Sequence, residues 1–153
     1  MSLEWKLLTK KRGSSTHLEG EALRVIHLGH TDTAHWTGLH LPSIDLVVSG
    51  DCVYNNTHLY LAECDEKARS EWLRALDGIE SLASEGSGGR TWRARSRQLA
   101  AHIDETRRYL LDFNECVTST STPLELYERM LSLHPNRVNP GSLWAAAKAA
   151  TPS

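Results

Sequence analysis

The sequence predicts an α+β fold, with a small, mostly antiparallel sheet followed by C-terminal helices. Two observations support this prediction. Strand-like patterns are confined to residues 22–48, and helical spacings of three and four begin at Asp65 and recur to the C-terminus. Strands that come first and helices that follow are typical of a sheet covered by helices on one face.

Three short segments predict strands. Residues 22–28 alternate loosely around Val25 and Ile26, residues 35–41 alternate between two faces, and residues 44–48 form a short apolar run. Each segment is followed by a predicted turn. The turns are Gly29-His30-Thr31, Pro42-Ser43 and Gly50-Asp51. We expect about four strands and four helices in all, with a modest core.

The clearest predicted helix covers residues 65–82. Asp65 suits the N-cap position, and one apolar stripe consists of Ala68, Trp72, Ala75, Leu76 and Ile79. A second helix is predicted over residues 98–113, with a stripe of Leu99, Ile103, Thr106 and Leu110. Both stripes predict core-facing sides.

Two shorter helices complete the predicted set. Thr122 can cap a helix that begins at Pro123, with Glu125 closing a capping box, and this helix must end before Pro135. Residues 142–150 form an Ala-rich final helix. Between the first two helices, residues 84–97 combine Gly, Ser and Arg without a period, which predicts an irregular loop. Residues 1–17 are basic and predicted to be a frayed end, residues 18–150 form the domain, and residues 151–153 form a tail.

Composition excludes several classes of function. The net charge is −2, which implies no strong attraction to nucleic acid or to an anionic membrane surface. No apolar run approaches the roughly 20 residues that span a bilayer. Three scattered cysteines, Cys52, Cys64 and Cys116, form no CxxC pair and favour reduced thiols, so we expect a cytoplasmic protein. No G-x-S-x-G or phosphate-loop motif occurs.

His30 and Asp51 are the candidate metal ligands. Each follows a predicted strand, where its side chain can project from the edge of a sheet into a cleft. A catalytic zinc site takes three protein ligands from His, Asp, Glu or Cys and keeps one position open for water. His27, His35, His40 and His58 are nearby in sequence, and His58 is the preferred third ligand because it follows the Asp51 loop. By spacing alone, a hydrogen-bonded turn residue is the more common role for each of them.

The sequence around these residues resembles that of the metallo-β-lactamase-fold hydrolases. The matching blocks are 29–33, 39–43, 46–51, 53–61, 71–82, 104–110 and 134–144, in the right order over residues 18–150. The resemblance implies half of an αβ/βα sandwich with metals where the halves meet. It implies that His30 and Asp51 hold zinc, that Asp51 bridges two ions, and that zinc-bound hydroxide attacks an ester, amide or thioester of a small molecule.

The chain departs from that family at most of its metal ligands. The HxHxDH signature is absent, and no His lies between His58 and His102, where the family has a Gly-His turn. Gly88-Gly89-Arg90 stands in that place. A local shift of reading frame or a mis-spliced exon is one hypothesis for this replacement. Genomic DNA without an alternative frame that encodes Gly-His there would contradict it.

Two functional hypotheses follow from the sequence. The first is a truncated metallo-β-lactamase-like hydrolase domain whose zinc site is incomplete and whose activity is weak or lost. The second is a non-enzymatic module that self-associates, or binds a complementing chain, through the sheet face that the missing half would cover. A homodimer is the simplest form of the second hypothesis.

Overall fold

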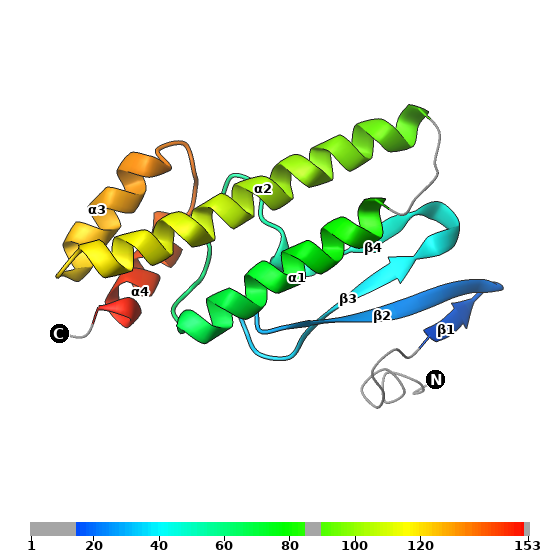
Figure 1. Ribbon diagram of the computed structural model, residues 1–153, viewed down its shortest axis with the longest axis horizontal. Helices are drawn as coiled ribbons and strands as arrows, with labels where there is room; N and C mark the ends of the chain where they lie inside the picture. Colours follow the sequence, from blue (N-terminus) through cyan, green and yellow to red (C-terminus); the bar gives the residue numbers. More distant parts are fainter. Residues whose placement is uncertain (1–14, 85–89, 152–153) are drawn as a thin grey trace.

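The computed structural model describes residues 15–84 and 90–151, and these residues form a four-stranded antiparallel sheet and four helices. The strands come first and the helices follow, so the predicted α+β class is confirmed. Figure 1 shows the sheet at one end of the molecule, α1 running along it, α2 on the far side of α1, and α3 and α4 at the other end. No helix in the described ranges has the length and apolar character needed to cross a membrane.

The sheet has the order β1-β2-β3-β4, with every neighbouring pair antiparallel. The strands are β1 (Ser15–Leu18), β2 (Glu21–Gly29), β3 (Trp36–Leu41) and β4 (Leu46–Val48). The three predicted strands are present, although Pro42–Ile44 form a 3-10 turn and shorten the last one.

β1 corrects one predicted boundary. A two-residue turn at Glu19 and Gly20, both with positive φ, folds β1 back on β2. Residues 15–17 therefore belong to the sheet, whereas the sequence placed them in a frayed end. The rest of that predicted end, residues 1–14, lies outside the described residues.

The helices are α1 (Glu66–Ser84), α2 (Arg90–Ser119), α3 (Pro123–Leu133) and α4 (Pro140–Ala150). The predicted capping box is confirmed, because Thr122 accepts from the Glu125 N–H and the Glu125 carboxylate accepts from the Thr122 N–H. The predicted irregular loop over 84–97 is wrong from Arg90 onward, where α2 has already begun. Residues 85–89 of that loop lie outside the described residues.

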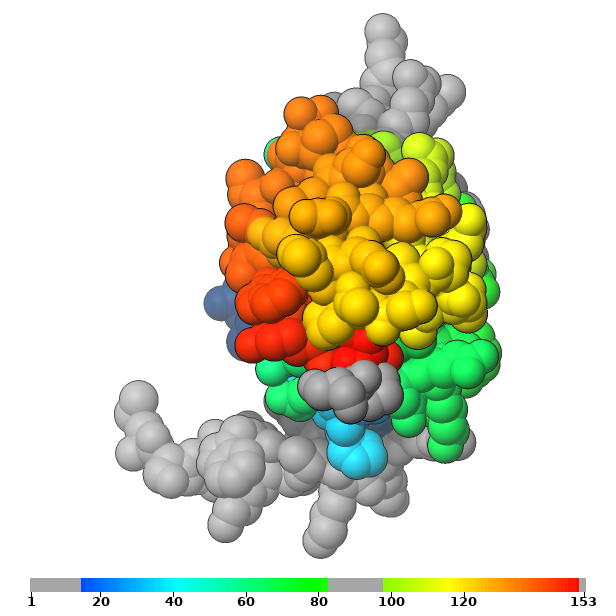
Figure 2. Space-filling model, turned by 90° about the vertical axis from the view of Figure 1, so that its left-hand side faces the viewer, coloured from blue at the N-terminus to red at the C-terminus, as the bar shows by residue number. Residues whose placement is uncertain are grey.

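The core lies between the sheet and α1 and continues between the helices. The predicted α1 stripe is buried throughout, with Trp72, Leu76 and Ile79 fully inaccessible. The Trp72 indole donates to the Cys52 carbonyl at 2.8 Å and ties α1 to the turn after β4. At the other end, α3, α4 and the end of α2 form a helical cluster, which faces the viewer in Figure 2.

The two faces of the sheet differ in what covers them. Ile26, Leu28 and Val47 point toward α1 and pack with the main core. Strand alternation sends Val25, which pairs with Leu39, to the opposite face. No described helix covers that second face, which we call the open face, so within residues 15–84 and 90–151 helices are layered on one side of the sheet only.

Candidate functional site

His30 lies in the loop that leaves β2, as the sequence predicts. Gly29 precedes it with a φ of +72°, a conformation that favours glycine. The His30 backbone N–H donates to the Glu71 carboxylate of α1 at 3.3 Å. Its side-chain Nε2 is buried and has no hydrogen-bond partner. This nitrogen is therefore a candidate ligand atom with no structural partner of its own.

The loop around His30 is held by its own polar groups. The Asp32 carboxylate accepts from the Thr33 N–H at 2.9 Å and the Thr31 hydroxyl at 3.1 Å. The Cys64 thiol donates to the Thr31 carbonyl at 2.8 Å. Burial raises the pKa of Cys64 to about 12, so this thiol is neutral at pH 7 and serves as a structural donor.

Asp51 lies in the short 3-10 turn Gly50–Cys52, directly after β4, and is exposed. Gly50 has a φ of +53°, and a Cβ atom there would lie 2.7 Å from the Trp36 ring. The packing of Trp36 thus requires glycine before Asp51. Cys52 is fully buried, and burial raises the pKa of its thiol to about 12, which disfavours it as a metal ligand.

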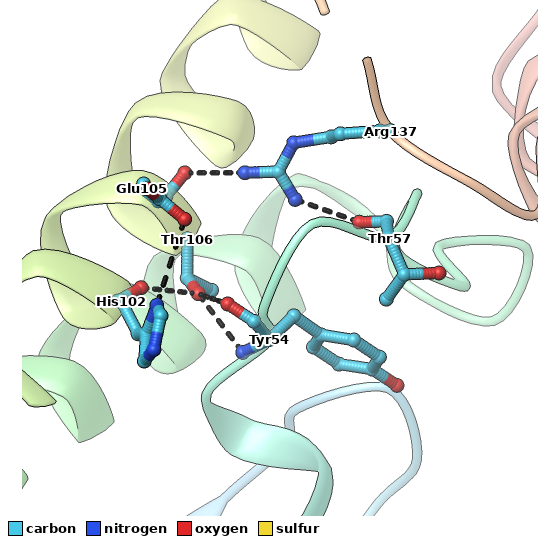
Figure 3. Close-up of polar contacts among 6 residues, drawn as sticks. All are labelled: Tyr54, Thr57, His102, Glu105, Thr106 and Arg137. Carbon is cyan, nitrogen blue, oxygen red and sulfur yellow. Dashed lines mark hydrogen bonds and ion pairs between the residues drawn. The ribbon is translucent and has the colours of Figure 1, made fainter. Parts of the chain in front are cut away.

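The segment that follows Asp51 is fixed by α2. The Tyr54 N–H donates to the Thr106 hydroxyl at 3.0 Å (Figure 3). The same hydroxyl lies 2.8 Å from the His102 carbonyl and 3.2 Å from the Tyr54 carbonyl, either of which can accept its proton. Thr106, predicted only as a position in the helical stripe, is thus a buried polar anchor.

His58 is 1% exposed and lies against α2. Its Nδ1 is 3.0 Å from the Tyr109 hydroxyl, while its Nε2 is buried without a hydrogen-bond partner. Burial, together with the positive charges of Arg137 and His134, lowers the pKa of His58 to about 4. The imidazole is therefore neutral at pH 7.

A second histidine extends this buried group, and sequence reasoning gave it no role. The His134 ring lies 4.8 Å from the Tyr109 ring, and its Nε2 is 2.9 Å from the Asp112 carboxylate. Burial and the charge of Arg137 lower the pKa of His134. The only sequence signal was the block His134-Pro135-Asn136-Arg137 within the resemblance.

The three predicted metal ligands do not form a zinc site by themselves. Neutral imidazoles with unpartnered nitrogens, as in His30 and His58, are suitable ligands one at a time. However, no group of three or more His, Cys, Asp or Glu side chains that could hold a metal occurs within residues 15–82 and 98–151, whose side chains the structure describes. His30, Asp51 and His58 are therefore not assembled as one such group, and zinc stays a prediction.

Comparisons with known proteins add no family. No family model matches the chain, and no curated protein or solved structure is similar to it at a significant level.

Proposed function

We propose that this chain is one half of a metallo-β-lactamase-like αβ/βα sandwich and that it acts as an interaction module through its open face. The observation that supports this proposal is the one-sided layering, with α1 on one face of the sheet and aliphatic side chains on the other. A sheet that is apolar on both faces needs a second layer to bury its uncovered face.

The register defines which residues form the open face. Val25 pairs with Leu39, and Leu39 pairs with Val48, so these three side chains lie side by side. Leu46 and Leu18 have the same orientation at the two edges of the sheet. Leu18 is 64% exposed, Val48 47% and Leu46 42%. Val25, between the two edges, is only 8% exposed, so the exposed part of the face lies at Leu18, Leu46 and Val48. Exposed aliphatic side chains that gather on one face mark protein interaction sites.

The partner that fits this face best is a second copy of the chain. A hollow on the open face is lined by Val25, His27, His35, Thr37, Gly38, Leu39, Val48 and Gly50. None of these residues is an Asp, Glu, Lys or Arg, so the hollow itself presents no like charges to a second copy, whereas Glu21 has the same orientation beside Leu18 at the edge of the face. A two-fold dimer would place sheet against sheet with helices outside, which is the layer order of a complete sandwich.

The dimer is tested by sedimentation velocity over a range of protein concentrations. We expect a monomer–dimer equilibrium in the wild type. Val48→Asp should weaken it roughly a hundredfold, because burying an unpaired carboxylate in an apolar contact costs about 3 kcal/mol or more. Leu124→Asp is the matched control, since Leu124 is 53% exposed on α3, away from the sheet. A wild type that is monomeric at every concentration contradicts the proposal.

Zinc-dependent hydrolysis is the second candidate function. The unpartnered, buried Nε2 of His30 favours it, because this nitrogen lies where the resemblance expects a ligand. The remaining ligands would have to come from another chain, and the isolated chain should be a weak or inactive hydrolase.

Elemental analysis of protein purified without chelator tests this candidate. About one zinc ion per chain, lost in both His30→Ala and Asp51→Ala, would support a metal centre. His17→Ala is the control, because His17 is exposed on β1. A parent protein without zinc, both alone and as the dimer, argues against metal-dependent hydrolysis.

A further inference from the structure

A second hollow, distinct from the one on the open face, includes residues of the segment between Asp51 and His58. It is formed where the α3–α4 connection passes over α2 and the segment after Asp51, and its polar lining includes Asn55, Asn56, Glu105, Arg108, His134 and Arg137. These residues come from three separate segments, which hydrogen bonds hold together. The Val138 N–H donates to the Asn56 carbonyl at 3.0 Å, and the His58 N–H donates to the Val138 carbonyl at 2.9 Å.

Arg137 occupies this hollow without a carboxylate as hydrogen-bond partner. Its two terminal nitrogens donate to backbone carbonyls, of Thr57 at 2.6 Å and of Glu105 at 3.0 Å (Figure 3). Its guanidinium lies 4.7 Å from the centre of the Tyr109 ring. Burial lowers the pKa of Arg137, although a guanidinium stays charged at pH 7. The negative charges of Glu105 and Asp112 act on this half-buried cation, but neither carboxylate hydrogen-bonds to it, so its remaining N–H groups can bind an anion.

Arg108 supplies a second positive charge at the same hollow. It is exposed, and no ion pair joins it to an acidic side chain among the residues that the structure describes. Arg108, Arg137 and His134 all line this hollow. Asn55 and Asn56 add side-chain amides, which can donate to an oxyanion.

We propose that this hollow binds a small oxyanion, a phosphate group, between Arg108 and Arg137. Planar guanidinium groups form paired hydrogen bonds with phosphate oxygens, and two of them neutralise a dianion. His134 lines the same hollow and is oriented through its Nε2 contact with Asp112, which leaves Nδ1 as its other ring nitrogen. The proposal is independent of the open face and of zinc.

Glu105 limits which phosphate compounds can bind. Its carboxylate lines the hollow and lies 3.7 Å from His102, with which it pairs when that histidine is protonated. A phosphate group would be repelled by this carboxylate and should occupy the side near the two arginines. A hydroxyl group on the same ligand could donate to Glu105. A hydroxylated phosphate monoester therefore suits the lining better than a second anionic group would.

Calorimetric titration with inorganic phosphate, at low and constant ionic strength, tests the proposal. We expect saturable binding to the wild type, weakened roughly tenfold in Arg108→Gln, since a charge-assisted hydrogen bond typically contributes that factor. Arg137→Lys keeps the positive charge but loses the planar guanidinium that can donate two parallel hydrogen bonds, and it should weaken phosphate binding by a similar factor. Glycerol phosphate should bind more tightly than inorganic phosphate, because its hydroxyl groups can donate to Glu105. Glu105→Gln should change this difference in affinity between the two ligands.

Arg74→Gln is the matched control, because it removes one exposed positive charge from α1. Unchanged phosphate affinity in this variant supports a built site. No saturable heat with the wild type overturns the proposal, and so does an equal loss in Arg74→Gln and Arg108→Gln. If Arg137→Lys fails to fold, Arg108→Gln decides, because an exposed side chain can be replaced without disturbing the core.

Discussion

At the scale of single residues, the structure places one nitrogen of the His58 ring in a buried hydrogen bond and leaves the other, Nε2, without a hydrogen-bond partner. Its Nδ1 contacts the Tyr109 hydroxyl, and the charged groups near it are Arg137 and His134, the latter paired with Asp112. A proton added to His58 would be buried near two other basic groups. The folded protein therefore resists protonation of His58 more strongly than the unfolded chain does.

This difference predicts a loss of stability in acid. The pKa of His58 is about 4 in the folded protein and 6.5 ordinarily. As pH falls from 6.5 toward 4, the unfolded chain takes up a proton that the folded protein excludes, so the free energy of unfolding decreases. The decrease should be on the order of 2 to 3 kcal/mol. Urea unfolding at pH 7 and pH 4.5 measures it.

A pair of variants isolates the contribution of His58. His58→Gln should lower stability at pH 7 and flatten the pH dependence, whereas His17→Gln, at an exposed strand position, should leave the wild-type slope unchanged. The lowered pKa of His134 acts in the same direction, so a smaller slope should persist in His58→Gln. Equal slopes in the wild type and His58→Gln would contradict the assignment.

At the scale of elements, a helix begins at its predicted residue where the sequence contains a capping motif. Where the sequence contains none, the observed start differs from the predicted one. α3 begins at the predicted Pro123 because Thr122 and Glu125 satisfy each other's backbone N–H groups. α2 begins eight residues before the predicted Gln98. Arg, Ala and Gln are good helix formers, and extending a helix that packing has already nucleated is inexpensive.

The cap at Thr122 gives a prediction for this scale. Thr122→Ala removes the oxygen that accepts from the Glu125 N–H at 3.2 Å. The variant should lose about 1 kcal/mol of stability, measured as a lower urea midpoint with an unchanged slope. Thr122→Ser should retain most of the stability that the cap contributes, because serine also has a hydroxyl oxygen that can accept from the Glu125 N–H. Ser121→Ala is the control, because Ser121 contributes only its backbone N–H to Glu125. Equal midpoints for Thr122→Ala and Ser121→Ala would contradict this role for the cap.

At the scale of the whole molecule, the sheet divides the chain into a covered side and an open side. If the open face pairs two copies, stability depends on protein concentration, because dimerisation stabilises the folded state by mass action. The dimer predicted above should therefore show a melting temperature that rises with concentration. Val48→Asp should melt at one temperature throughout, while Leu124→Asp should follow the wild type.

The sequence by itself determined most of the elements and most of the core. Periodicity identified the α1 stripe from Ala68 to Ile79, and turn residues identified the limits of β2 and β3 closely, because both signals are local. β1 escaped prediction because four exposed residues carry no apolar alternation and depend on pairing with β2.

The tertiary structure alone decided which chemistry-bearing residues meet. It paired His58 with Tyr109 across 51 positions and Arg137 with the Thr57 carbonyl across 80, contacts that no local pattern encodes. It also left His30 and Asp51 outside any described group of three metal-binding side chains, although their spacing suited a shared site. Spacing along a chain fixes which strand end a residue follows. Which side chains converge depends on how the layers pack.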